Sequence, residues 1–211
     1  MSGLVSPADD DPAVEDAQRR GRILWALAES MAEKGYRATT IADIARVARV
    51  SKTVVYTHFR DKEHCLLELY SRATDRVLEV VREAQENAHE EGLSWRDRLR
   101  AVIRAYFETL ATGPAVAWAS LIEVQAAGRS ALSLRREVLE RYVDLLTAVA
   151  DELARDHPEE VRPVERRLIL AAVGGINELM LARIERGDAE HLPEDADVAA
   201  DVLIGLLETR G

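Results

Sequence analysis

The chain has 211 residues, of which 47% are hydrophobic, and its formal net charge is −10. This length allows either one large helical domain or a small domain joined to a larger one. The longest uninterrupted apolar run, residues 168–176, is too short to cross a bilayer, and the acidic residues 1–11 lack the pattern of a secretory signal. We therefore expect a cytoplasmic protein without a membrane partner.

The charge is distributed unevenly along the chain. Residues 17–62 carry ten Lys and Arg against four Asp and Glu, whereas residues 63–211 carry 18 basic against 29 acidic residues. A basic segment attached to an acidic remainder can present one face to nucleic acid and keep the other face away from it. A solvated charged surface is an equally good interpretation of the charge alone.

The composition predicts an all-α fold, because helix-forming residues dominate and glycine and proline are few. The first predicted helix begins at Pro12, with Asp11 as its cap, and ends at Gly35. Hydroxyl and carboxylate caps then start three more helices, over residues 41–47, 52–59 and 62–88. The predicted caps are Thr40, Ser51 and Asp61. Two short helices therefore lie between two longer ones.

Apolar spacing and breaker residues predict five further helices, for a total of about nine. Ser94 caps the fifth helix, which Gly113 and Pro114 end. The others are expected over residues 114–127, 130–156, 163–186 and 194–209.

Residues 35–63 read GYRATTIADIARVARVSKTVVYTHFRDKE, and this segment closely resembles the DNA-binding region of TetR-family transcriptional regulators. The G-Y, T-T-I, I-A, V-S, Y-x-H-F and K-E elements occur at the family spacing, and the likeness extends from residue 23 to residue 67. The resemblance implies a three-helix helix-turn-helix DNA-binding domain over residues 12–60 and a helical ligand-binding and dimerisation domain over residues 61–211. It also implies a regulator that is not an enzyme and needs no cofactor.

The resemblance assigns roles within the helix-turn-helix by position. Side chains at the start of a recognition helix reach base edges in the major groove, and flanking groups hold phosphates. The base-facing candidates are Lys52, Thr53, Val54 and Thr57, and the candidates for phosphate or register contacts are Thr40, Ser51, Tyr56, His58 and Lys62. Capping alone is an alternative role for Thr40 and Ser51.

Arg49 stands where the family usually has glycine in the turn, which predicts a left-handed backbone at a residue with a side chain.

The predicted second domain contains aromatic residues in an alanine-rich setting, with a few polar residues nearby. A mainly apolar pocket with a few polar groups is the usual form of a small-molecule site. The candidate ligand-binding residues are Tyr106, Phe107, Trp118, Glu123, Gln125, Tyr142 and Asn177. Ordinary core packing is the alternative for each aromatic residue, and the identity of the ligand does not follow from the sequence.

The eighth predicted helix is apolar nearly all round and contains Gly174 and Gly175, a composition that favours close contact with another helix. Together with the ninth helix it would form half of a four-helix homodimer interface, as the resemblance implies. The apolar residues expected there on the ninth helix are Val198, Val202, Leu203, Leu206 and Leu207. The interpretation is a dimeric repressor that a small, mainly apolar ligand releases from a palindromic DNA operator.

Two alternatives stay open. One is a DNA-binding or docking module without ligand regulation. The other is an all-α enzyme, although the sequence lacks the common nucleotide, hydrolase and zinc motifs. Glu86 and His89 form a single E-x-x-H pair, whereas a dimetal bundle needs two, so we expect no metal. The sole cysteine, Cys65, lies among apolar residues and is expected to be buried.

Overall fold

The computed structural model describes residues 12–209, and over these residues the chain forms nine α-helices. The predicted all-α fold is confirmed, while the expected cap Asp11 lies outside the described residues. The α-helices are α1 (Pro12–Ala38), α2 (Ile41–Ala48), α3 (Lys52–His58), α4 (Lys62–Glu90), α5 (Trp95–Ala111), α6 (Pro114–Leu121), α7 (Arg129–Asp156), α8 (Arg166–Glu185) and α9 (Ala196–Leu207). Two 3-10 helices, η1 (Glu123–Ala126) and η2 (Ala189–Asp195), precede α7 and α9.

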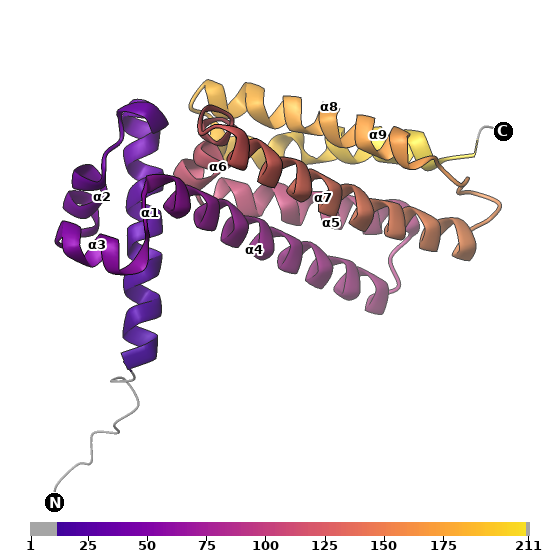
Figure 1. The fold of residues 1–211 in the computed structure, drawn as a ribbon. Coiled ribbons are helices and arrows are strands. Elements are labelled where there is room, and N and C mark those ends of the chain that lie inside the picture. The colour runs from indigo at the N-terminus through magenta and orange to yellow at the C-terminus, as the bar shows by residue number, and fades with distance from the viewer. Residues whose placement is uncertain (1–11, 210–211) are drawn as a thin grey trace, which may run out of the picture.

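The helices form two regions, which we call the head (residues 12–60) and the body (residues 61–209). Helices α1 to α3 make the head at one end of the molecule, and the long helices α4, α5, α7 and α8 with α9 run side by side in the body (Figure 1). Within the body, α4 packs along α5, and α5 packs along α9. Helix α6 contacts α1, so it lies where the body meets the head.

Local caps fix the starts of the helices that the sequence predicts. Thr40 and Asp43 form a reciprocal capping box, in which the Asp43 N–H donates to the Thr40 hydroxyl at 3.3 Å and the Thr40 N–H donates to the Asp43 carboxylate at 2.9 Å. The side chains of Ser51, Asp61 and Ser94 likewise accept hydrogen bonds from the first turns of α3, α4 and α5. All four predicted caps are confirmed.

Three predicted helices are longer than the observed ones by four residues or more. The ninth begins at Ala196 and ends at Leu207, because η2 occupies the residues before it and residues 208–209 pair with residues 160–161. The sixth ends at Leu121 and not at residue 127, because the chain tightens into η1, where Val124 packs into the body and Glu123 faces the head. The eighth begins at Arg166, because the residues before it pair with the end of α9. There the Arg162 N–H donates to the Leu207 carbonyl at 2.8 Å.

That pairing is part of a cluster at the end of the body far from the head, which we call the C-terminal clasp (residues 95–96, 160–162 and 207–209). The Thr209 N–H donates to the Glu160 carbonyl at 2.9 Å. Arg96 pairs with Glu160 at 2.9 Å and also with Glu208, and the Trp95 indole donates to Glu160 at 3.0 Å. Three stretches far apart in the sequence are therefore joined.

The head core crosses the predicted domain boundary at residue 60. Its fully buried residues include Leu27, Ile44, Val55 and Phe59, and they pack with Cys65, Leu66, Leu69 and Ala119 from the body. The predicted burial of Cys65 is confirmed, and burial raises the pKa of its thiol to about 12. The division into two domains remains a prediction.

The outer face of α8 and α9 is apolar and open. Leu168, Val198 and Val202 are 45%, 55% and 44% exposed. Leu203 and Leu207, which the sequence analysis assigned to this face, instead lie in the core of the chain, because α9 turns them toward the other body helices. No helix among residues 12–209 is long and apolar enough to span a membrane.

Candidate DNA-binding face and internal pocket

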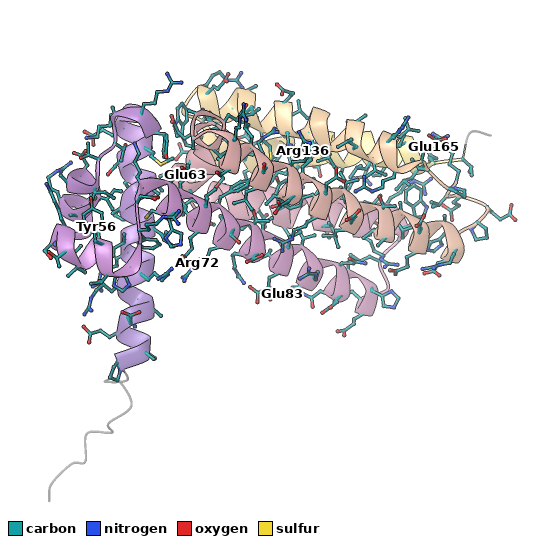
Figure 2. All side chains as sticks on the ribbon, viewed as in Figure 1. Tyr56, Glu63, Arg72, Glu83, Arg136 and Glu165 are labelled. Carbon is teal, nitrogen blue, oxygen red and sulfur yellow. The ribbon has the colours of Figure 1, made fainter. Side chains whose placement is uncertain are left out.

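Helix α3 has one anchored face and one open face. Val55 within it and Phe59 just after it are buried in the head core. Lys52, Thr53 and Thr57 are exposed, and so is Tyr56, which Figure 2 shows on the surface of the head. Val54 is half-buried between the two faces. The anchored face holds the helix in place while the polar side chains stay available to a partner.

The turn before α3 has the predicted left-handed residue. Arg49 has φ 56° and ψ 44°, and it is the only residue with a side chain that has positive φ among residues 12–209. Its N–H donates to the Arg46 carbonyl at 3.3 Å, and the Val50 N–H donates to the Ala45 carbonyl at 3.0 Å. These bonds close the end of α2, and the Arg49 side chain remains exposed beside α3.

Two of the residues predicted to contact DNA make contacts with residues of the head instead. The Lys62 ammonium donates to the Thr39 carbonyl at 2.7 Å and to the Tyr36 carbonyl, and it lies 4.1 Å from the centre of the Tyr36 ring. Burial lowers the pKa of Lys62. The His58 side chain is only 6% exposed and lies 3.7 Å from Asp16. Both residues support the fold of the head, and a phosphate contact from either remains a prediction.

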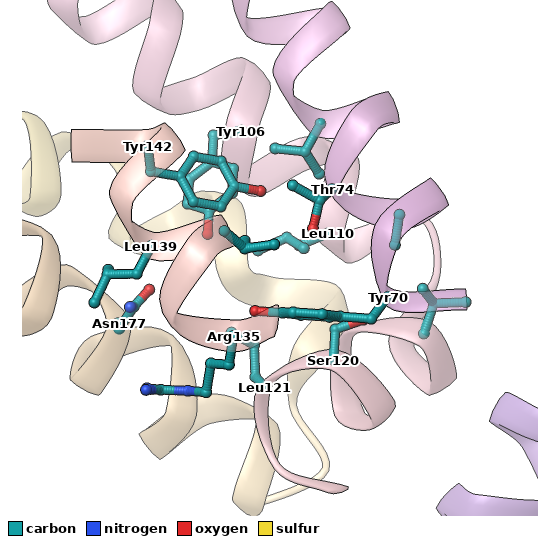
Figure 3. Close-up of a pocket in the computed structure, with 14 residues that line it drawn as sticks. Tyr70, Thr74, Tyr106, Leu110, Ser120, Leu121, Arg135, Leu139, Tyr142 and Asn177 are labelled. Atoms are coloured by element: carbon teal, nitrogen blue, oxygen red, sulfur yellow. The ribbon is translucent and has the colours of Figure 1, made fainter. Parts of the chain in front are cut away.

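The body contains two adjoining, partly open cavities of about 60 and 40 Å³, which share Tyr106, Tyr142 and Asn177 in their walls. The larger cavity lies mainly between α4, α6 and α7, and Figure 3 shows the residues around it. The smaller one lies between α5, α7 and α8. The two tyrosine rings stand 5.7 Å apart, and burial raises the pKa of both hydroxyls, so both stay neutral. Three predicted ligand-binding residues thus meet at one place.

The other four predicted ligand-binding residues do not line these cavities. Phe107 is fully buried in the body core, with its ring edge toward Tyr106. Gln125 is exposed and donates to the Leu121 carbonyl at 2.8 Å. Trp118 lies beside an open cleft between α6 and the end of α8, and its indole donates to Glu123 at 3.1 Å. Spacing along one helix could not show which of these residues turn away from the pocket.

Glu123 joins the body to the head. One carboxylate oxygen accepts from the Trp118 indole, and the other accepts from the Tyr36 N–H at 2.7 Å. Tyr36 follows Gly35, where the backbone leaves helical geometry with φ 79°. We call this set of contacts the Glu123 link. It ties the last turn of α1, which follows the kink at Gly35 and precedes α2, to η1, three residues after the pocket residue Ser120.

Four polar residues of the larger cavity were not predicted from the sequence. Tyr70 and Thr74 line it from α4, Ser120 from α6 and Arg135 from α7. They stand on three helices, so no motif connects them, and only the packing of those helices brings them together.

Within residues 12–209 no three His, Cys, Asp or Glu side chains gather as a metal site would require. Glu86 and His89 line an open surface cleft that also contains Arg82 and Arg98.

Comparison with known proteins agrees with this arrangement. The sequence pattern of "Bacterial regulatory proteins, tetR family" matches residues 23–69. The HTH-type transcriptional activator FasR of Mycolicibacterium smegmatis is 36% identical over 91 residues, which are 43% of this chain and 40% of that protein. The match thus spans less than half of that relative.

Two solved structures share the fold over most of the chain. The fatty acid degradation regulator FadR from Bacillus halodurans has a TM-score of 0.79 at 19% identity, covering 96% of this chain and 97% of that one. FadR from Bacillus subtilis, in complex with stearoyl-CoA, has a TM-score of 0.72 at 21% identity, covering 87% and 97%.

Proposed function

We propose that the chain is a member of the TetR family of bacterial regulatory proteins, a transcriptional regulator rather than an enzyme, and that it acts as a dimeric repressor released from DNA by a fatty acyl effector. The observation that carries the proposal is the open face of α3, in the segment that matches the family. The internal cavities and the Glu123 link support the proposed response to an effector.

The proposed DNA contacts follow from the exposure of α3. Its open face enters the major groove, where Lys52, Thr53 and Thr57 reach base edges and the half-buried Val54 meets a thymine methyl. Thr40, Ser51 and Tyr56 are exposed at the rim of this face, where they contact phosphates or fix the register. Lys62 and His58 act mainly by holding the head in shape for this contact.

The proposed dimer forms through α8 and α9. Leu168, Val198 and Val202 are exposed there, which an isolated chain would leave in water. Gly174, Gly175 and Gly205 lie within these helices, and a Cβ at any of them would meet nothing within 4 Å. Mid-helix glycines cost about 1 kcal/mol each relative to alanine, and no contact among residues 12–209 requires them. A second copy packed closely on this face explains both features and completes a four-helix interface.

The dimer is tested by placing a carboxylate on this face. Val202→Asp is expected to convert the protein to a monomer in sedimentation, because it buries an unpaired charge in the interface. Leu132→Asp is the control, since Leu132 is 49% exposed on α7, which is not one of the two helices of the proposed interface. A dimeric Val202→Asp protein would contradict the proposed interface.

The proposed effector class rests on the apolar cavities and on the fatty acid regulators with the same fold, one of which binds stearoyl-CoA. An effector regulates only by preferring one conformation of the protein. The Glu123 link supplies a physical route, because a shift of α6 moves Glu123 and hence the turn that precedes α2.

The whole proposal is tested by mapping bound DNA across the genome and then titrating the recovered operator. We expect an inverted repeat whose half-sites lie about one DNA turn apart, roughly 34 to 36 Å. Hexadecanoyl-CoA or hexadecanoate should weaken operator binding, and deletion of the gene should raise transcription beside the sites. Operator binding that neither compound changes would indicate a DNA-binding module without fatty acyl regulation. Transcription that falls on deletion would indicate an activator.

A further inference from the structure

The larger cavity contains one charged side chain and no carboxylate. Arg135 reaches it from α7, and Tyr70, Thr74, Ser120 and Asn177 are among its polar neighbours. The smaller cavity has no charged lining residue at all. The two cavities therefore differ in polarity, and the only full charge in either is positive.

Arg135 is a half-buried cation without a counter-ion. Among the described residues it forms neither an ion pair nor a hydrogen bond, whereas Arg141 on the same helix pairs with Asp75 at 2.8 Å. A guanidinium that loses part of its hydration without gaining a partner is costly. Its five N–H donors match the geometry of a carboxylate or a phosphate.

Two hydroxyls in the larger cavity also lack partners. The Ser120 hydroxyl oxygen is buried without a hydrogen bond, and the residue is only 8% exposed. Tyr70 is 7% exposed and forms no hydrogen bond within the described chain, and Figure 3 shows its hydroxyl pointing toward the side of the pocket where Arg135 and Asn177 lie. Native proteins seldom leave buried polar groups unpaired, so each calls for an explanation. A bound molecule with acceptor oxygens satisfies all three residues at once.

The smaller cavity suits the apolar part of a ligand. Apart from the shared Tyr106, Tyr142 and Asn177, its walls are entirely apolar and include Val102, Leu145 and Val173. A ligand that fills both cavities must pass the two tyrosine rings, so its polar end and its apolar end have fixed positions.

We propose, resting on the proposed function, that the effector is an amphipathic anion held head-first: Arg135 and Tyr70 bind its anionic group, Ser120 donates to a neighbouring oxygen, and its apolar chain runs past Tyr106 and Tyr142 into the smaller cavity. A free carboxylate and an acyl thioester with a phosphate-bearing carrier share this chemistry. Both offer acceptor oxygens at the head of an apolar chain.

The test measures direct binding of three probes with the same chain length, in the absence of DNA. Hexadecanoate carries the carboxylate, hexadecanoyl-CoA carries the thioester and phosphates, and hexadecan-1-ol carries no charge. At least one anionic probe should bind about ten- to a hundredfold more tightly than the alcohol, which corresponds to one charge-assisted interaction. The anionic probe that gains this advantage identifies the source.

Variants assign the effect to the named residues. Arg135→Ala should abolish the preference for the anion and leave affinity for the alcohol within about twofold, and Arg135→Lys should recover part of it. Arg136→Ala is the matched control, because Arg136 is the exposed neighbour on α7 (Figure 2). Ser120→Ala should weaken anion binding by about tenfold without lowering the melting temperature, because the hydroxyl has no partner to lose.

Three results would overturn the proposal: an alcohol that binds as tightly as the anions, an Arg136→Ala protein as impaired as Arg135→Ala, or no binding of any probe. The measurement uses no operator. The probes can therefore fail to bind in the proposed way while the protein still binds its operator and is regulated by another compound. Conversely, the probes can bind as proposed even if they do not release the operator.

Discussion

The head and the body both contain polar side chains that lack partners within the described chain, but those of the head face solvent and those of the body face a cavity. In the head, Lys52 and Thr53 face solvent on the open side of α3. In the body, Ser120 and Arg135 face an internal cavity between helices. The difference indicates the size of each expected partner. Exposed polar side chains on one helix can contact a large molecule such as DNA, whereas polar side chains around a cavity can contact only a molecule small enough to enter it.

The largest expected effect comes from a substitution in the core of the head, which should impair the head and leave the body intact. Phe59 is 1% exposed and packs between Arg20, whose guanidinium lies 4.6 Å from the ring centre, and the edge of His64. Phe59→Ala should destabilise the head by about 3–5 kcal/mol, through lost burial and the cavity left behind. Operator binding should disappear, while the body still binds the acyl probe.

Phe107→Ala is the matched control, because Phe107 is fully buried in the body core and the chain has only these two phenylalanines. Phe107→Ala should impair binding of the acyl probe more than binding of the operator. Hydrogen exchange resolved by region measures both variants. Equal loss of protection in head and body for Phe59→Ala would show that the two regions unfold as one unit.

A smaller effect is expected from cutting the Glu123 link. Glu123→Ala leaves the Tyr36 N–H and the Trp118 indole without their acceptor, at about 1–3 kcal/mol for the partly buried donors. Operator affinity and probe affinity measured separately should change little. The probe should release the operator about five- to tenfold less effectively, because coupling between the two sites is reduced.

Gln125→Ala controls for the position, since Gln125 is exposed two residues away and bonds only to the Leu121 carbonyl. Operator titration with and without the probe gives the coupling directly. Full release in Glu123→Ala would mean that the signal reaches the head by another route.

The smallest expected effect concerns Arg49. Glycine tolerates its left-handed backbone without strain, although it also raises the entropy of the unfolded chain, so Arg49→Gly should gain less than about 1 kcal/mol of stability. Loss of the charge beside α3 should weaken operator binding and reduce its salt dependence by about one phosphate contact.

Arg49→Ala separates the two contributions, because it removes the charge and keeps the side-chain strain. Urea unfolding and operator titration at two salt concentrations measure both. A clearly less stable glycine variant would show that Arg49 is not strained, and unchanged affinity at low salt would show that its charge does not contact DNA.

The head was more predictable than the body because its structure depends on neighbours in the sequence. The Thr40 and Ser51 caps and the backbone at Arg49 follow from bonds within a few residues. The pocket depends on contacts across helices, so the sequence identified Tyr106 and Tyr142 but missed Ser120 and Arg135.

The end of the sixth helix and the contacts of Trp118 could not be predicted from the sequence, for the same reason. An α-helical pattern continues through residues 114–127, yet the chain tightens at Ile122, where Glu123 turns toward Tyr36, 87 residues away. The alanine-rich setting made Trp118 a ligand-binding candidate, and it does not show that the Trp118 indole donates to that same carboxylate. Only the position of the head relative to the body determines these contacts.

The C-terminal clasp restrains the body helices at one end. Arg96, Glu160 and Glu208 join three stretches of chain at the end opposite the head. We expect helices that are held together there to separate less at that end when a ligand binds between them. The displacement is then expected to be larger at the other end, where α6 meets α1 and the body joins the head.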